Sequence, residues 1–146
     1  MKLEGTYTVP APREIVWNAL LDPEILARAM PGCEKLVPNP DGSFSAELKV
    51  GIAMVKGKYK GRIEILDRVP PEHFRMKVDG QGSGGFLKGE GTLTFSEAAG
   101  ETLITYSGDA QVGGLIASVG QRLILGAARQ IVDQFFKALA GQIAAD

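Results

Sequence analysis

Four long segments of this chain alternate between polar and apolar residues with a period of two. Over positions 58–65 the even positions carry Lys58, Lys60, Arg62 and Glu64. The same alternation recurs over 75–82, 87–95 and 105–112. Successive side chains of a β-strand point to opposite faces, so these segments predict a long antiparallel sheet with one wet and one dry face.

The dry face of this predicted sheet is unusual because glycine occupies many of its positions. These inward glycines, assigned by parity, are Gly5, Gly61, Gly80, Gly82, Gly89, Gly91 and Gly108. Two explanations stand side by side: glycine permits sheet curvature and the close approach of a helix, or it leaves an apolar hollow for a ligand. An empty hole the size of a large side chain costs about 2–5 kcal/mol, so several holes require a helix or a ligand to fill them.

The segments before and after the alternating strands predict the remaining elements. Proline, glycine and Asp22, which reads as a helix N-cap, mark their limits. We expect a strand over 2–9, short helices over 13–21 and 23–30, strands over 33–38 and 44–50, and a helix over 115–143.

This order predicts an α+β fold in a single domain, residues 1–146, in which a curved antiparallel sheet wraps around a long C-terminal helix. Two short helices follow the first strand. The polar residues of the long helix fall on one narrow stripe, so most of its surface must be covered. Leu125, Val132 and Phe136 flank that stripe and require the short helices, a partner or a membrane surface as cover.

Composition excludes several classes of protein. The formal net charge is −1 and no run of Lys or Arg appears, which gives nucleic-acid binding little support. The single cysteine, Cys33, cannot form an internal disulfide and suits a reducing compartment. The N-terminus has no signal-peptide core, and no apolar run reaches the roughly 18 residues of a membrane span. We therefore expect a cytoplasmic protein.

Motifs that would carry chemistry are absent or incomplete. Positions 80–85 read Gly-x-Gly-x-x-Gly, but a dinucleotide site needs a helix next, and 86–95 alternates as a strand. His73 is the only histidine, which excludes a histidine-rich metal site, and no Gly-x-Ser-x-Gly elbow is present. We predict no catalytic or metal-ligating residue.

Several segments carry a resemblance to a known family. The element order is that of the helix-grip fold shared by birch-pollen-allergen-like and lipid-transfer START-type proteins. Within it the chain resembles the carbon monoxide dehydrogenase G-subunit family in Val16-Trp17, Asp22-Pro23-Glu24, Pro31-Gly32-Cys33-Glu34, Leu103 to Gly114, Gly120 to Ile124 and Gln134-Phe135-Phe136.

The resemblance implies an accessory role. Members of that family accompany aerobic molybdenum-containing CO dehydrogenases, and carrying a quinone between membrane and enzyme is attributed to them. It implies a non-catalytic protein without a cofactor of its own, whose bound ligand is quinone-like. Some members have a hydrophobic tail for membrane attachment; this chain stops at Asp146 without one. Either the tail was removed or this member docks without it, and we expect peripheral contact at the inner face of the cell membrane.

The predicted ligand site is an apolar cavity between the curved sheet and the long helix. Its expected wall and rim are Tyr7, Phe44, Leu48, Tyr59, Ile63, Met76, Phe86, Leu93, Tyr106, Leu123 and Ile131. Tyr59 and Tyr106 are candidate donors to ligand carbonyls, and the Phe86 loop is either a lid or a plain hairpin. Two alternatives stay open: an assembly factor that docks without a ligand, and a small-molecule enzyme of the same superfamily.

Overall fold

One antiparallel sheet dominates the molecule, with helices against its concave face. The computed structural model describes residues 1–52 and 55–145. The strands are β1 (Lys2–Val9), β2 (Cys33–Pro38), β3 (Phe44–Val50), β4 (Gly57–Val69), β5 (His73–Gly82), β6 (Gly85–Ala98) and β7 (Glu101–Gly113). The helices are α1 (Arg13–Leu20), α2 (Pro23–Ala29), the 3₁₀ helix η1 (Leu115–Val119) and α3 (Gln121–Ala145).

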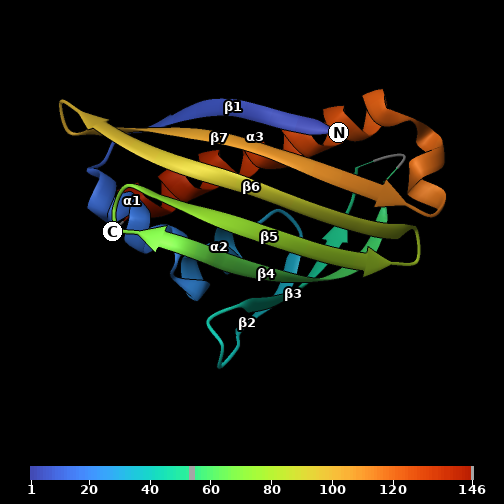
Figure 1. Ribbon diagram of the computed structural model, residues 1–146. Helices are drawn as coiled ribbons and strands as arrows, with labels where there is room; N and C mark the ends of the chain where they lie inside the picture. Colours follow the sequence, from blue (N-terminus) through green and yellow to red (C-terminus); the bar gives the residue numbers. More distant parts are fainter. Residues whose placement is uncertain (53–54, 146) are drawn as a thin grey trace.

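The sheet runs in the order β1-β7-β6-β5-β4-β3-β2. Consecutive strands from β2 to β7 pair with their chain neighbours, and β1 closes the series by pairing with β7. Helix α3 lies along the far side of the sheet in the view of Figure 1, with α1 and α2 near its C-terminal end. The expected α+β helix-grip arrangement is therefore confirmed.

The two short helices begin where the sequence predicts. Pro12 precedes α1, and the Asp22 carboxylate accepts a hydrogen bond of 2.9 Å from the backbone N–H of Glu24, so Asp22 caps α2. Trp17 of α1 meets the rings of Phe74 and Phe95 edge-on, with centroids 5.4 and 5.7 Å away. This aromatic group joins α1 to the sheet and closes the core at that end.

The C-terminal helical segment differs from the expectation of one helix over 115–143. It consists of η1 and α3, separated at Gly120, whose φ is +95°. Gly114 at φ +81° likewise precedes η1. These left-handed conformations, which glycine adopts without a Cβ penalty, stop the helix between the two elements. The apolar periodicity continues through Gly120, which is why the pattern alone extends the helix too far.

One residue of the proposed helix-surface strip is in the core. Phe136 is only 3% exposed and stacks on Tyr7 with ring centroids 5.5 Å apart. Val132 is half-buried and packs against the same core cluster. The expectation that Phe136 needs a cover other than the sheet is therefore wrong, because Tyr7 and Tyr106 of the sheet pack against it.

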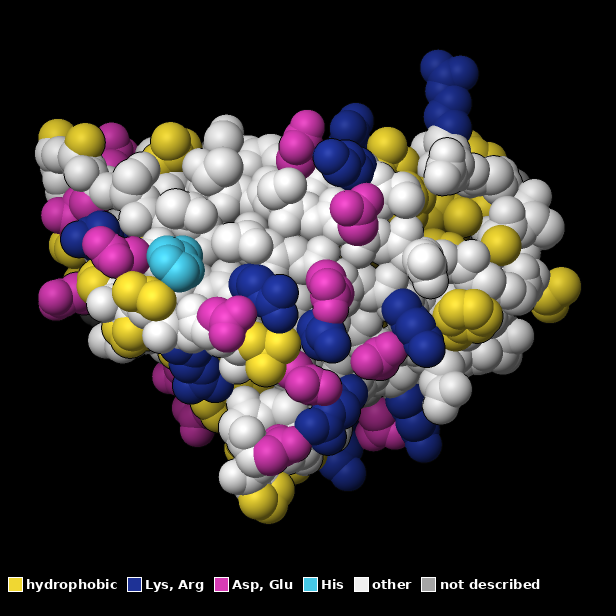
Figure 2. Space-filling model, in the orientation of Figure 1, with side chains coloured by type: hydrophobic (Ala, Val, Ile, Leu, Met, Phe, Trp, Pro, Cys, Tyr) yellow, Lys and Arg dark blue, Asp and Glu magenta, His cyan; other side chains and the backbone are white. Residues whose placement is uncertain are grey.

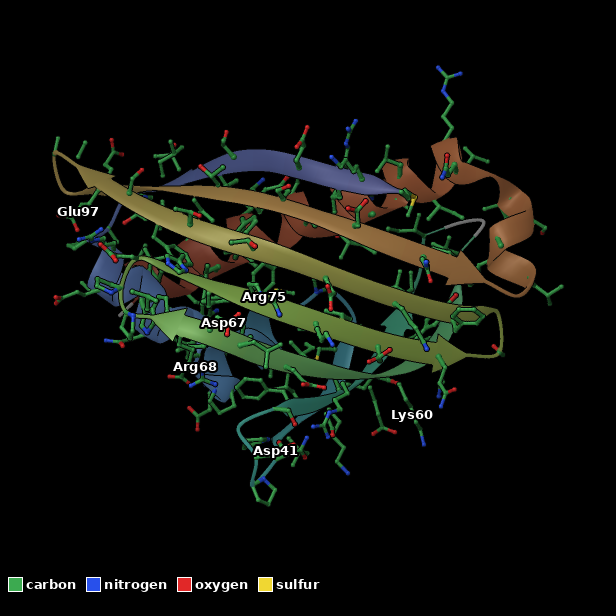
Figure 3. The ribbon with its side chains drawn as sticks, in the orientation of Figure 1. Asp41, Lys60, Asp67, Arg68, Arg75 and Glu97 are labelled. Carbon is green, nitrogen blue, oxygen red and sulfur yellow. The ribbon has the colours of Figure 1, made fainter. Side chains whose placement is uncertain are left out.

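The convex face of the sheet is polar, as the alternation predicts. Charged side chains of both signs intermingle on it in Figure 2. Arg75 of β5 lies beside Asp67 of β4 in Figure 3, with Nε and Oδ2 2.9 Å apart, and Lys77 Nζ lies 3.3 Å from Glu90 Oε1. Such exposed pairs each add little to stability, so their main effect is to keep this face wet.

Candidate ligand-binding site

The interior is closed at one end and open at the other. Val9, Phe74, Phe95 and Ile104 are at most 2% exposed and pack with α1 and the C-terminal half of α3. Further along the same strands, the inward side chains are only half-buried: Ile63, Val78, Leu87, Ala110 and Val112. Since these residues point away from the wet face, their partial exposure means that solvent reaches the concave side at this end.

The inward glycines differ in how closely other atoms approach them. A Cβ added at Gly91 would lie 3.0 Å from the Ser107 carbonyl oxygen, and one at Gly108 would lie 2.8 Å from that of Glu90. These two glycines face each other across β6 and β7, so they serve the close approach of the two strand backbones. The curvature explanation holds for this pair.

Gly80 and Gly89 are different because there is room for a side chain above them. At Gly80 a Cβ would meet only the Lys60 carbonyl oxygen at 3.8 Å, and at Gly89 its nearest neighbour would be the Asp109 carbonyl oxygen at 3.5 Å. Both distances are ordinary contacts. Close strand approach therefore does not require glycine at these two positions, and for them the cavity explanation remains.

An aromatic cluster fills the interior at mid-length. Phe136 of α3 lies against both Tyr7 and Tyr106, with ring centroids 5.5 and 5.6 Å away. The Tyr106 hydroxyl passes over Gly5, where an added Cβ would be 2.6 Å from its oxygen. Gly5 is therefore required by the position of Tyr106. The cluster separates the closed core from the open end.

A cleft of about 460 Å³ lies between the middle of α3 and the end of β3. Its lining residues are Pro31, Gly32, Lys49, Val50, Gly51, Ile52, Gln130, Ile131 and Gln134. The volume is within the range of small-molecule sites. The lining combines apolar side chains with amide and ammonium donors, so it suits a ligand with an apolar body and polar acceptors.

A second cleft of about 460 Å³ lies nearby and is lined by charged groups. Glu47, Lys58 and Lys60 are among its residues, and Lys60 Nζ lies 3.7 Å from Glu47 Oε1. Desolvating such charges is costly, so this cleft is a poor site for an apolar ligand.

The eleven predicted site residues fall into several groups. Tyr7 and Tyr106 form the aromatic cluster with Phe136, and Leu93 and Met76 belong to or pack against the main core. Phe44 pairs with Ile63, and Leu48 pairs with Tyr59, on β3 and β4. Two predicted residues lie apart: Leu123 is 52% exposed on the first turn of α3, and Phe86 is 43% exposed over Gly113 on the outward parity of β6. Ile131 lines the first cleft.

The two candidate tyrosine donors differ in their partners. The Tyr59 hydroxyl donates a 2.8 Å hydrogen bond to the Val55 carbonyl oxygen, so its proton is engaged. Among the described residues, the Tyr106 hydroxyl has no hydrogen-bond partner. Burial raises the pKa of Tyr106, and the nearby Asp133 carboxylate raises this pKa further. Tyr106 is therefore a neutral donor at pH 7.

Sequence reasoning missed the polar lining of the first cleft. Gln130 and Gln134 are one helical turn apart and flank Ile131, a spacing that places both amides on one side of α3. That spacing is the signal that would have found them. Within the described part of the chain, no group of three or more His, Cys, Asp or Glu side chains is arranged to hold a metal ion.

Comparisons with known proteins agree on the family and on the fold. The family of the carbon monoxide dehydrogenase G subunit (CoxG) matches residues 5–144. A search of curated proteins finds no match. A conserved protein from Geobacillus kaustophilus is 36% identical and superposes with a TM-score of 0.96, covering 99% of this chain and 96% of its own.

More distant structures share the architecture alone. A START superfamily protein from Mycobacterium smegmatis is 15% identical, with a TM-score of 0.75 over 99% of this chain and 97% of its own. Protein CV1439 from Chromobacterium violaceum is 19% identical, also with a TM-score of 0.75, over 99% of each chain. The fold is thus START-like. Because the family match spans nearly the whole sequence, the chain belongs to the carbon monoxide dehydrogenase G-subunit (CoxG) family.

Proposed function

We propose that this protein is a non-catalytic carrier that binds a lipophilic small molecule, a quinone in the first instance, and passes it between the membrane and a molybdenum-containing CO dehydrogenase. Membership of the CoxG family supports the partnership with that enzyme. The open end of the interior supports ligand binding. Shape fit and desolvation, with no covalent step, account for such a role.

The observation that carries this proposal is that glycine occupies positions 80 and 89 of the concave face although a Cβ would fit at each. Small residues pair across the strands on both sides of these positions: Ala46 with Gly61, Gly61 with Gly80, and Gly89 with Ala110. Leu87 lies opposite Gly80, and Val78 lies opposite Gly89. A folded domain gains stability by filling such volume with its own side chains. Small residues at these positions are consistent with a bound ligand that supplies the packing contacts which larger side chains would otherwise make.

Polar groups of the aromatic cluster and of the first cleft match the acceptors of a quinone. A quinone ring is flat and apolar at its faces and accepts hydrogen bonds at two carbonyl oxygens. Tyr106 offers a hydroxyl donor, and Gln130 and Gln134 offer amide donors at the cleft. Few polar groups in an apolar site give orientation without a large desolvation cost.

Reconstitution tests the proposal. The protein is mixed with bacterial membranes, re-purified and extracted with organic solvent, and the extract is analysed by mass spectrometry. We expect a quinone in the extract and a rise in melting temperature when decylubiquinone or menadione is added, because ligands that bind only the native state stabilise it. No lipophilic species in the extract, together with no thermal shift, would falsify the proposal.

A further inference from the structure

Basic residues concentrate in three segments that are far apart in the sequence. Segments 48–63, 80–89 and 110–132 together contain eight Lys and Arg and no Asp or Glu. The remainder of the chain holds the other eight basic residues and all 17 acidic ones. The net charge of −1 therefore conceals a strongly positive part and a strongly negative part.

Described parts of all three segments meet at one end of the molecule. The Ile116 N–H of η1 donates a 2.8 Å hydrogen bond to the Gly84 carbonyl oxygen of the β5–β6 hairpin. Tyr59 of β4 pairs with Gly82 at the same hairpin. In Figure 1 this end lies at the right, opposite α1 at the left. It is also the end at which the interior is open.

The same end exposes large apolar side chains. Leu115 of η1 is 74% exposed, Leu123 of α3 is 52% exposed and Phe86 of β6 is 43% exposed. Hydrophobic atoms are visible at the right-hand end of the surface in Figure 2. Leu115 and Leu123 are the two most exposed of the large hydrophobic residues that the described chain leaves on its surface.

Several basic groups at this end are available to an outside partner. Among the described residues, Lys60 and Arg62 are held in ion pairs with carboxylates, whereas Lys56, Lys58 and Arg122 are exposed and form no salt bridge. Lys58 stands opposite Lys49 in the β3–β4 register, so two like charges are adjacent. An external anionic surface would relieve that repulsion.

We infer that this end, the portal surface formed by Lys56, Lys58, Phe86, Leu115, Leu123 and Arg122, docks on an anionic lipid bilayer. Basic groups around exposed aliphatic side chains match lipid phosphates above a hydrocarbon layer. A nucleic acid offers phosphates but no hydrocarbon to receive Leu115 and Leu123. The inference rests on the proposed function in one respect: docking in this orientation sets the open interior against the lipid.

Vesicle co-flotation tests the surface. The probes are vesicles of roughly equal parts phosphatidylglycerol and phosphatidylcholine, and vesicles of phosphatidylcholine alone, each at about 50 mM and about 500 mM NaCl. We expect binding to the anionic vesicles that weakens at high salt. The triple variant Lys56→Gln/Lys58→Gln/Arg122→Gln should bind them roughly 100-fold more weakly, since each basic residue near the surface contributes about fivefold.

A matched control removes the same charge elsewhere. The variant Arg68→Gln/Arg75→Gln/Lys137→Gln changes three exposed basic residues away from the portal surface, and Figure 3 shows Arg68 and Arg75 toward the opposite end of the sheet. It should bind anionic vesicles as the wild type does to within a few-fold. Equal losses in the two triple variants would overturn the inference, because net charge alone would then explain binding. So would equal affinity for both kinds of vesicle, equal affinity for a DNA duplex, or no vesicle binding at low salt.

Tryptophan fluorescence tests which end of the protein contacts the bilayer. In the Leu115→Trp variant the indole should shift its emission to the blue on anionic vesicles, while Ile15→Trp, at a position 49% exposed on α1, should not shift. A blue shift for Ile15→Trp alone would mean that the α1 end, and not the portal surface, contacts the bilayer, and would overturn the inference. The quinone thermal shift is measured in parallel without vesicles. If the wild type lacks that shift but still binds vesicles through the portal surface, the carrier proposal fails and the docking inference stands.

Discussion

Substitutions at Gly89 and Gly91 separate unfilled space from close strand approach. Both are inward positions of β6, two residues apart, so they share a face and a strand. A Cβ at Gly89 would meet the Asp109 carbonyl oxygen at 3.5 Å and the Ala110 Cβ at 3.8 Å, which are ordinary contacts. A Cβ at Gly91 would meet the Ser107 carbonyl oxygen at 3.0 Å and the Gly108 Cα at 3.4 Å, which forces the backbone of β7 to move.

The two alanine variants should therefore change stability in opposite directions. Gly89→Ala reduces the entropy of the unfolded chain without a native clash and should stabilise the protein by about 0.4–1 kcal/mol. For a domain of this size that corresponds to a rise in melting temperature of about 1–4 °C. Gly91→Ala crowds two strand backbones and should destabilise by about 1–3 kcal/mol, as other overpacked sites do.

A larger side chain at the same position tests for the ligand. Gly89→Leu should fold, because the side chain extends into open space, and should abolish the thermal shift given by decylubiquinone. Circular dichroism and chemical denaturation measure folding, and the thermal shift measures binding. If Gly89→Leu unfolds the protein as severely as Gly91→Leu, the space above Gly89 is not available. If Gly89→Leu folds and binds the quinone as well as the wild type, the ligand lies elsewhere.

Three further predictions concern single side chains. Tyr106→Phe should weaken quinone binding about fivefold with little change in melting temperature, because among the described residues its hydroxyl bonds to nothing; an unchanged affinity by titration calorimetry would count against Tyr106 as the donor. Asp22→Ala removes the N-cap of α2 and should cost about 1 kcal/mol, measured by urea denaturation, whereas Asp22→Asn should restore most of it. Hydrogen bonds from Ser43, then Arg62, lower the pKa of Asp41 from 3.8 to about 2, so its contribution is present above about pH 4 and is lost as the pH falls toward 2. The difference in melting temperature between the wild type and Asp41→Asn should shrink as the pH falls from about 4 toward 2, and a difference at about pH 2 as large as that at about pH 5 would refute the assignment.

Local patterns predicted the strands and the short helices well. The period-two alternation reports directly on which side chains face water, and the strand bounds 2–9, 33–38 and 44–50 agree with β1, β2 and β3. Asp22 and Pro23 marked the start of α2 because capping depends on neighbouring residues only. The break at Gly120 escaped prediction, since a glycine inside an apolar period signals a helix interior as readily as an interruption.

Features that depend on distant residues were not predictable in the same way. The seven inward glycines look alike in the sequence, but Gly91 lies beneath the backbone of β7, whereas Gly80 and Gly89 lie beneath open space. The difference comes from the distance between neighbouring strand backbones at each position. The alternation of inward and outward residues does not indicate that distance. Gln130 and Gln134 likewise became site residues only when α3 was placed beside the end of β3.

The distribution of charge over the surface is the clearest example of a feature that depends on residues distant in the sequence. A count over the whole chain is nearly neutral and argued against nucleic acid as a partner. Antiparallel hairpins, however, return the chain repeatedly to the same two ends, so residues spaced by one hairpin length accumulate at one end. Three carboxylate-free segments thereby form a positive end next to the open interior, although no window of the sequence contains a basic run. For a sheet of long hairpins, the informative quantity is therefore the charge at each end of the strands, and net charge conceals it.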